Sequence, residues 1–484
     1  MKFVLISGLF SAFLATAQLT GPVGPLTALS QKTHECNILD YGAINDNSTD
    51  ASDAIEKTFK TCVLSHAGSR LIIPDGQYLI KRSVVLSNGT NWALQLDGLI
   101  TLAYGGNWTV DRDGQFLQNG LTIINPVDFE FYSQNGKGAI QGQGYIYRNL
   151  ANTFRPRLVR IISPINTSVH DLILVDSPKF HIVFDFAENL EVYHLTIRGA
   201  NLGSYDGVDV VGTNYWIHDI EVTNRDECVS VKSPSDHALI ENLVCNQAGS
   251  GISIGSLNVS ASIANIHARN INIIQGNNIA FIKTYPGGSG HVTNITFENF
   301  RSKASLYGLD INQYWQNTFE PDTGAVALSN LLFKNFSGKC KVDKKATKTN
   351  NRVPGSVADG SKRPPLFLVA NDLTFATNVT VEDFSIWTES GTSVVNKISN
   401  IFGHGDNSYG QSDGIKSLSS GQAPTAYTST YTVTATPTRW KAPSLPTWAA
   451  ASTGYGTDVP IPVYTPAALW KPSGDYDKHY WGSF

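Results

Sequence analysis

The sequence predicts an all-β fold, a right-handed parallel β-helix, from the length of a repeat and the pattern inside it. Strand-like phrases recur between "VHDLILVDS" at 169 and "VTVEDFSIW" at 379, most with Asn or Asp just ahead of alternating aliphatic residues. Steps of 23, 25, 23, 28 and 24 residues separate the positions taken as equivalent, which are Leu172, Leu195, Ile220, Leu243, Ile271 and Ile295. A βαβ unit needs roughly 30 or more residues, so this period indicates a solenoid with about three short strands per coil.

Two other all-β folds also contain alternating strands, the β-sandwich and the β-propeller. Sandwich strands do not keep a fixed period over such a length, and propeller blades repeat at about 40 residues or more. The β-helix is therefore the preferred prediction.

The first residues, "MKFVLISGLFSAFLATAQ", have the order of a secretory signal. Lys2 supplies the positive charge, an apolar stretch covers 3–14, and Ala15-Thr16-Ala17 is a small-residue cleavage site. The apolar stretch is too short to span a bilayer. We therefore expect residues 1–17 to be removed as a signal peptide, and the mature protein to be soluble, secreted and extracellular.

A short amphipathic helix is predicted in "STDASDAIEKTFKTC" at 48–62, where it would cover the N-terminal end of the solenoid. Thr49 or Asp50 is the expected N-cap. The side chains expected to face inward are Ala54, Ile55, Phe59 and Cys62. We assign the β-helix, as the catalytic domain, to 18–405 and a C-terminal extension rich in Ser, Thr and Pro to 406–484.

The composition narrows the range of partners. Charged residues make up 16% of the chain and the net charge is −4, whereas a nucleic acid or a membrane surface calls for a basic stripe. We expect neither of these partners and a monomeric protein; a neutral or anionic substrate fits the balance. Sequons, typical of a eukaryotic secreted glycoprotein, are present at Asn47, Asn88, Asn107, Asn166, Asn258, Asn294, Asn335 and Asn378.

Five cysteines are present in a chain that is predicted to be secreted. Two local loops would be closed by the pairs Cys36–Cys62 and Cys228–Cys245, which we expect to be disulfides. Cys340 is left over in the lysine-rich segment "GKCKVDKKATK". No spacing of Cys and His resembles a zinc site.

Carboxylates are grouped in "GSYDGVDVVG" at 203–212 and "NRDECVSVK" at 224–232, as Asp206, Asp209, Asp226 and Glu227. Such a group repels itself, so solvent, a metal ion or a reaction must account for it. Equivalent positions on successive coils lie ~4.8 Å apart, so these side chains can meet in one cleft. Since consecutive strand residues face opposite sides, Asp226 and Glu227 can share that cleft only at a bulge or a strand end.

Several phrases together resemble a known family over roughly residues 20–400. "DGVD", "RDECVSVKSP", "GSGISIGSL" and "IAFIKTYPGGSG" resemble the polygalacturonase-type glycoside hydrolases, family 28, and "DYGAINDNSTDASDAI" resembles the N-terminal phrase of pectin-degrading β-helix enzymes. The pair Asp226-Glu227 replaces two adjacent aspartates of the polygalacturonase pattern, and Ser250 replaces a histidine. Fungal rhamnogalacturonases share both departures and the phrase "LDI…YW" found here at 309–315.

This resemblance implies an inverting hydrolase, without a metal or another cofactor, that acts on the rhamnogalacturonan of plant cell-wall pectin, where galacturonate and rhamnose alternate. Glycoside hydrolysis needs a carboxylic acid to protonate the leaving oxygen and a carboxylate to activate water. By the family match, Asp226 is the general acid, Asp206 and Glu227 are the bases that hold water, and Asp209 orients its neighbours. Crowding and partial burial are expected to raise at least one carboxyl pKa.

Two lysines are candidates for contacting an acidic substrate. Lys283, in "FIKTYPGGSG", is expected to bind a galacturonate carboxylate and to lower the pKa of nearby carboxylates. Lys232 follows Asp226 on the same strand and is a second candidate. Each of them has the alternative of being an ordinary surface lysine.

Two glycines and two aromatic residues are further candidates for substrate binding. Gly249 and Gly251 either let a sugar approach the backbone closely or are ordinary turn glycines. Tyr314 and Trp315 either stack on a sugar ring or pack within the fold.

Other functions remain open on the same fold. Within the family, these are a polygalacturonase and an exo-acting rhamnosidase or galacturonidase, although we expect endo action on rhamnogalacturonan. A pectate-type lyase would use the carboxylates to hold Ca²⁺ and a basic residue to abstract a proton. A catalytically silent carbohydrate-binding solenoid would keep binding its polysaccharide after loss of the carboxylates.

Overall fold

The computed structural model describes residues 18–112, 115–199, 205–224, 226–315, 322–340, 365–389, 391, 394–407, 414–433 and 440. The predicted signal peptide, 1–17, and much of the predicted C-terminal extension lie outside these residues. Within the described part, no helix combines the length and the apolar character needed to cross a membrane.

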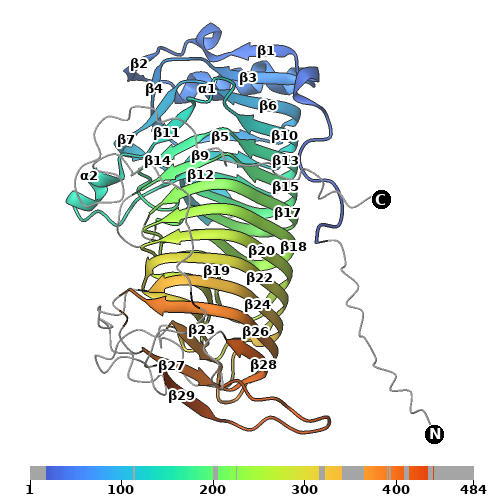
Figure 1. The fold of residues 1–484 in the computed structure, drawn as a ribbon. Coiled ribbons are helices and arrows are strands. Elements are labelled where there is room, and N and C mark those ends of the chain that lie inside the picture. The colour runs from blue at the N-terminus through green and yellow to red at the C-terminus, as the bar shows by residue number, and fades with distance from the viewer. Residues whose placement is uncertain are drawn as a thin grey trace, which may run out of the picture.

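The protein is a right-handed parallel β-helix, as predicted, with α1 at its N-terminal end (Figure 1). Successive coils pair in parallel and build three stacks of strands along the solenoid, called stacks 1, 2 and 3 here. The longest strands turn corners and contribute to more than one stack; β18 contributes to all three. Stack 1 contains β1 (His34–Asn37), β3 (Ser69–Ile73), β6 (Thr90–Leu96), β10 (Val127–Tyr132), β13 (Ile165–His170), β15 (Ile182–Tyr193), β17 (Val208–Thr223), β18 (Glu227–Asn246), β20 (Ala261–Ile274), β22 (Gly290–Ser305), β24 (Ala327–Cys340), β26 (Ala376–Thr388) and β28 (Ile401–Asn407).

Stack 2 begins with short strands and continues in the C-terminal ends of the long strands from β17 onward. Its short strands are β2 (Asp46–Asp50), β4 (Gln77–Arg82), β7 (Leu99–Asn107), β11 (Ala139–Gln141), β14 (Ile173–Val175) and β16 (Thr196–Arg198). Stack 3 includes the N-terminal ends of β15, β17 and β18. Its other strands are β5 (Val84–Ser87), β9 (Gln115–Ile124), β12 (Arg157–Ile162), β19 (Ser250–Leu257), β21 (Asn278–Thr284), β23 (Tyr307–Asn312), β25 (Leu366–Val369) and β27 (Val394–Ser399).

A few elements lie outside the parallel coils. The strand β8 (Thr109–Arg112) forms an antiparallel hairpin with β9. The helices are α1 (Ser52–Thr61), α2 (Gly144–Asn149) and the 3₁₀ turns η1 (Leu29–Gln31), η2 (Ile38–Tyr41) and η3 (Val63–Ser65). The strand β29 (Thr428–Val433) pairs antiparallel with β27. It comes from the predicted extension, and the proposed boundary at 405/406 falls inside β28; that boundary remains a prediction.

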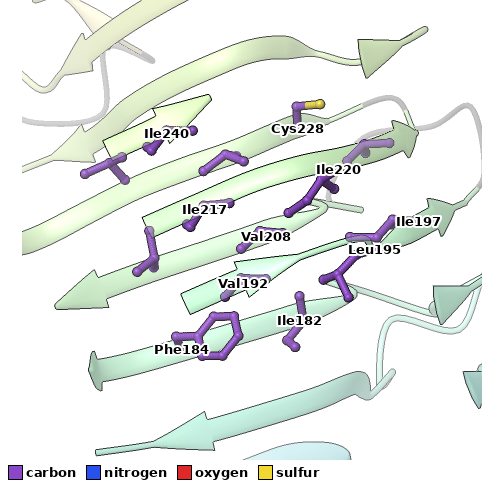
Figure 2. Close-up of a cluster of buried hydrophobic side chains, with 14 of the residues drawn as sticks. Ile182, Phe184, Val192, Leu195, Ile197, Val208, Ile217, Ile220, Cys228 and Ile240 are labelled. Atoms are coloured by element: carbon purple, nitrogen blue, oxygen red, sulfur yellow. The ribbon is translucent and has the colours of Figure 1, made fainter. Parts of the chain in front are cut away.

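The core consists of aliphatic columns that run along the solenoid axis. Val208 lies beside Ile182 on one neighbouring coil and beside Val229 on the other, and all three side chains are fully buried. Figure 2 shows such side chains pointing into the space between the strands, Ile182 and Phe184 on β15 and Val208, Ile217 and Ile220 on β17. Burying each aliphatic side chain contributes roughly 1.5–3 kcal/mol, so the repeated coils stabilise one another.

The register corrects one of the positions taken as equivalent in the sequence. Leu243 pairs with Ile271 as predicted, but Ile271 pairs with Phe300, and Ile295 pairs with Ile266. Each of these coils has two corners at which an Asn with positive φ precedes a buried apolar residue. The asparagines are Asn265 (φ 54°), Asn270 (φ 56°), Asn294 (φ 55°) and Asn299 (φ 59°). Since Asn tolerates the left-handed region, the same local pattern marks both corners, and the sequence pattern alone does not distinguish them.

Helix α1 buries the predicted face but begins later than predicted. Ala54, Ile55 and Phe59 are buried, as is Cys62 just past the helix end. The N-cap is Ala51, which makes no side-chain cap bond. Asp50, one residue earlier, accepts hydrogen bonds from the Ser52 amide (3.0 Å) and the Lys81 amide (3.1 Å). The predicted cap at residue 49 or 50 is therefore wrong, because the bond to β4 keeps Asp50 in the extended β2.

Both predicted disulfides are present, Cys36–Cys62 and Cys228–Cys245. Cys340 is a free, fully buried cysteine at the end of β24, and burial raises the pKa of its thiol. The sequon asparagines that are exposed are Asn47, Asn88, Asn107, Asn294, Asn335 and Asn378; Asn166 and Asn258 are half-buried.

Candidate active site

The four predicted carboxylates converge at the N-terminal ends of two neighbouring strands in stack 3. Asp206 lies just ahead of β17 and Asp209 inside it, while Asp226 lies just ahead of β18 and Glu227 is its first residue. One oxygen from each of Asp206, Asp226 and Glu227 lies within 4.8 Å of the others. The predicted strand end is confirmed at Asp226, which explains how adjacent residues point into one cluster.

Backbone hydrogen bonds orient the Asp226 carboxylate. Its Oδ1 accepts from the Glu227 amide at 3.1 Å and its Oδ2 from the Tyr205 amide at 3.3 Å. The side chain is half-buried, whereas Asp206, Asp209 and Glu227 are 4–5% exposed. Asp226 is therefore the member of the cluster that is most open to solvent.

Two lysines lie beside different carboxylates of the cluster. Lys283 Nζ forms an ion pair and hydrogen bond with Glu227 Oε1. Lys232 Nζ lies 3.8 Å from Asp206 Oδ2 and 3.9 Å from Asp209 Oδ1, and donates to the Gly255 carbonyl at 3.0 Å. Both lysines were expected to contact substrate, but their ammonium groups are held by carboxylates of the protein.

The carboxyl groups differ in their protonation. Burial raises the pKa of Asp206 well above its usual range, and the neighbouring Asp209 and Glu227 raise it further. Burial also raises the pKa of Asp209, partly offset by Lys232 and by a side-chain hydrogen bond from Asp206. For Glu227, burial opposes ionisation, but the charge of Lys283 and a hydrogen bond from Asp226 hold its pKa well below the usual range. The cluster thus combines groups that keep a proton with one that stays ionised.

Two buried side chains that were not singled out in the sequence position this cluster. His181 is fully buried, its Nδ1 lies 3.0 Å from the Asp206 carbonyl, and burial lowers the pKa of its imidazole to about 4. Asn224 Nδ2 donates to the carbonyls of Tyr205 (2.8 Å) and Glu227 (3.0 Å), and so ties the two carboxylate-bearing turns together. Neither has a local signature, because their partners lie on other coils or in turns of irregular shape.

The two candidate glycines lie against the protein itself. A Cβ on Gly251 would lie 2.7 Å from the Ile279 carbonyl oxygen and 2.8 Å from Ile273 Cγ1. The lack of a side chain there makes room for the next coil, which favours the packing alternative for Gly251. Gly249 is half-buried and its amide donates to the Asp226 carbonyl at 2.5 Å, so it supports the carboxylate turn.

The two candidate aromatic residues differ in position. Tyr314 is 5% exposed, packs with Phe367 and Val369, and its hydroxyl accepts a hydrogen bond from the Asp372 amide at 2.9 Å. It is a packing residue rather than an open platform. Trp315 is half-buried, and its ring lies 5.3 Å from Lys283 Nζ and edge-on to Phe281. Of the two, Trp315 lies beside the carboxylate cluster.

The disulfide Cys228–Cys245 begins at the residue that follows Glu227, and links the start of β18 to its end. We expect the double substitution Cys228→Ala/Cys245→Ala to lower the free energy of unfolding by about 3 kcal/mol. It should also reduce kcat, because the Asp226-Glu227 turn loses its anchor. Denaturant unfolding and steady-state kinetics measure the two effects.

The matched control is Cys36→Ala/Cys62→Ala, which removes the disulfide at the N-terminal cap. It should lower the free energy of unfolding by a similar amount and leave kcat unchanged. Equal losses of kcat in the two variants would show that the site does not depend on its local disulfide.

The cluster has the ligand types of a cation site, since Asp206, Asp226 and Glu227 offer three carboxylate oxygens. Two of the three, however, already have a lysine beside them, Glu227 with Lys283 and Asp206 with Lys232. A second grouping, His34 with Cys36 and Cys62, has its two sulfurs joined in the disulfide and so offers no thiolates.

Relatives of known sequence cover nearly the whole chain. Residues 65–356 match the family model described as glycosyl hydrolases family 28. The chain is 38% identical over 461 residues to rhamnogalacturonase A of Aspergillus niger, covering 95% of this chain and 94% of that protein. It is also 38% identical over 463 residues to rhamnogalacturonase A of Aspergillus aculeatus, covering 95% of each.

Solved structures share the fold at lower identity. The endo-xylogalacturonan hydrolase of Aspergillus tubingensis superposes with a TM-score of 0.61 at 22% identity, over 77% of this chain and 95% of that one. The polygalacturonase of Erwinia carotovora ssp. carotovora does so with a TM-score of 0.53 at 16% identity, over 83% and 99%. Taken with the family match and the carboxylate cluster, these findings show that the chain belongs to glycosyl hydrolases family 28 and is a glycoside hydrolase.

Proposed function

We propose that this protein is a secreted hydrolase of rhamnogalacturonan, the pectin backbone, and that it cuts galacturonate–rhamnose α-glycosidic bonds within the chain. The observation that carries the proposal is the cluster of Asp206, Asp226 and Glu227 beside two lysines, in a chain 38% identical to rhamnogalacturonases over 95% of its length. Secretion is supported by the signal-like N-terminus and the two disulfides.

Asp226 is the proposed general acid. It is the most open of the four carboxyls, and it hydrogen-bonds to Glu227, whose pKa is held low. A carboxyl group that donates to an ionised neighbour carries a proton, and that proton can pass to the leaving glycosidic oxygen. Asp206 and Glu227 hold the attacking water, and the ionised Glu227 is the better acceptor of its proton. Asp209 orients and tunes Asp206.

The resemblance supports inversion at the anomeric carbon. The nearest oxygens of the cluster lie within 4.8 Å, closer than the ~6.5–9.5 Å between the carboxyl groups of most inverting enzymes. Proton NMR of the first-formed product decides the point. The inverted anomer supports two-carboxylate activation of water, and the retained anomer would make one of them a nucleophile.

Lys283→Met should shift the acid limb of the kcat/KM profile to higher pH by about 1–3 units. The reason is that Lys283 lowers the pKa of Glu227, so its removal leaves Glu227 protonated over part of the present working range. Met is unbranched like Lys and uncharged, so it also loses the cation–π contacts of Nζ with Phe281 and Trp315. Measuring kcat/KM between pH 3 and 8 gives the shift.

Lys334→Met is the control for this change, because the Lys334 side chain is 43% exposed and its Nζ lies 3.9 Å from Glu382, away from the carboxylate cluster. Its profile should match that of the unmodified protein. If the acid limb of the kcat/KM profile does not shift in Lys283→Met, Glu227 is not the base.

The deciding assay gives the purified protein de-esterified rhamnogalacturonan and, separately, homogalacturonan, with product sizes and reducing ends followed over time. We expect a rapid fall in size of rhamnogalacturonan alone. Monomers released from chain ends would indicate exo action, and cleavage of homogalacturonan alone would indicate a polygalacturonase. New ultraviolet absorbance that a chelator abolishes would indicate a lyase.

A further inference from the structure

The N-terminal ends of successive strands in stack 3 lie at one level along the solenoid, called the row of strand starts here. This row contains the carboxylates, and on their N-terminal side it contains the cation Arg157. Leu158 N donates to the Phe180 carbonyl at 3.1 Å and His181 N to the Asp206 carbonyl at 2.9 Å, so Arg157, Phe180 and Asp206 occupy the same level on successive coils. Glu227 follows on the next coil, because Val208 pairs with Val229. Arg157 therefore lies two coils from Asp206, about 10 Å at ~4.8 Å per coil.

Arg157 and its neighbour Lys179 have no carboxylate partner among the described residues. Both are half-buried, and the Nε of Arg157 is buried without a hydrogen bond. Arg157 Cζ and Lys179 Nζ each lie 5.3 Å from the centre of the Phe180 ring, within the range of a cation–π contact. Two cations held partly out of water around one ring repel each other, which is unfavourable unless an anion joins them.

Neighbouring cations strengthen the field but are already engaged. Arg160 Nε pairs with Asp185 at 2.5 Å, and Arg155 Nη1 donates to the Tyr205 hydroxyl at 2.9 Å. Arg157 opposes the pKa rise of Asp209, and burial with repulsion from Arg157 lowers the pKa of the Lys179 ammonium. Arg157 thus acts electrostatically both on Lys179 beside it and on Asp209 in the carboxylate cluster.

Among the described residues, the same level on the other side of the cluster carries no unpaired cation. The same level continues through Ser250, Asn278 and Tyr307, which are neutral. Lys283, on that side, is paired with Glu227. In the part of the chain that the structure describes, the row of strand starts is therefore cationic toward the N-terminal coils and neutral toward the C-terminal coils.

We propose that Arg157 and Lys179 form a subsite that binds the carboxylate of a galacturonate residue on the N-terminal side of the cut bond. This inference rests on the proposed function, and it adds which sugar of the alternating polymer lies at this position relative to the cut bond. A guanidinium and an ammonium beside one ring match a planar carboxylate, whereas rhamnose offers them no charge. An alternating polymer would then be held so that an acidic sugar, and not a neutral one, occupies this position.

The test compares Arg157→Gln/Lys179→Gln with the unmodified protein on two substrates, rhamnogalacturonan oligosaccharides and the same oligosaccharides with their carboxyl groups reduced to alcohols. On the acidic substrate we expect KM to rise about 10- to 100-fold with kcat changed by less than about threefold. On the reduced substrate the two proteins should be equal. Added salt should raise KM of the unmodified protein on the acidic substrate only.

Lys60→Gln, which removes an exposed charge on α1, is the control and should behave as the unmodified protein. An equal loss on both substrates, or no loss on either, would overturn the subsite. Calorimetric binding of the acidic oligosaccharide to Asp226→Asn protein, with and without the two cation changes, gives the same comparison without turnover. Failure of the proposed function appears separately, as lack of rhamnogalacturonan cleavage by the unmodified protein.

Discussion

Asp226→Asn should lower kcat on rhamnogalacturonan by about 10³–10⁴-fold, with little change in KM. An amide of the same shape has one acceptor oxygen, so it can keep one of the two hydrogen bonds from the Tyr205 and Glu227 amides, and it has no acidic proton to give to the leaving oxygen. The side chain is half-buried at the end of a strand, so the fold should tolerate the change. Initial rates of reducing-end release and the melting temperature measure both expectations.

Asp53→Asn is the matched control, since the Asp53 side chain is 92% exposed on α1. It should leave kcat unchanged. Full activity of Asp226→Asn would show that Asp226 is not the general acid. If the unmodified protein binds the polysaccharide but does not cleave it, the protein is a carbohydrate-binding solenoid.

Asp206→Asn should lower kcat by about 10²–10³-fold and, at the same time, stabilise the protein near neutral pH. Burial and the nearby carboxylates raise the folded-state pKa of Asp206, so its ionised form is disfavoured in the fold. The contribution of such a group to stability is fully present below its ordinary pKa and is lost as pH rises through the folded-state pKa. Asn has no charge to form, so the variant escapes this loss.

The gain should be about 1.4 kcal/mol for each unit by which the pKa is raised, absent near pH 3 and full above the folded-state pKa. Denaturant unfolding at pH 3, 5 and 7 measures it alongside the kinetics. Lower stability than the unmodified protein at pH 7 would mean that Asp206 is ionised and well paired in the fold.

Glu227→Gln supplies the contrast of opposite sign. The pKa of Glu227 is lowered in the fold, so its contribution to stability is present above its ordinary pKa and is lost as pH falls through the folded-state pKa. Removing its charge at pH 7 also leaves Lys283 buried and unpaired, which we expect to cost about 3 kcal/mol or more. Two neighbouring acids should thus affect stability in opposite directions while both support turnover.

Much of the architecture can be predicted from short stretches of the sequence. The step of 23–25 residues from Leu172 to Leu243 predicts the coil, because each coil must present apolar side chains at the same places to its neighbours. The disulfides Cys36–Cys62 and Cys228–Cys245 were also predictable, since each closes a loop of 26 or fewer residues. The grouping of four carboxylates in two adjacent coils also predicted that they meet, and the structure brings Asp206, Asp226 and Glu227 together.

The partners of those carboxylates depend on how the coils stack. Lys283 and Lys232 look in the sequence like contacts for an acidic substrate, yet the fold pairs them with Glu227, Asp206 and Asp209. Arg157, separated from Asp206 by nearly fifty positions, joins the same row because the one intervening coil, which carries Phe180, aligns it there. Register between coils is set by the whole core, and a repeated Asn–aliphatic pattern marks two different corners.

Local sequence thus specifies which groups of this hydrolase are available and roughly where along the solenoid they lie. Burial, side-chain direction at strand ends and the charge found one or two coils away specify which group keeps a proton, which stays ionised and which remains unpaired. These properties arise between segments distant in sequence, because desolvation and Coulomb interactions act through space.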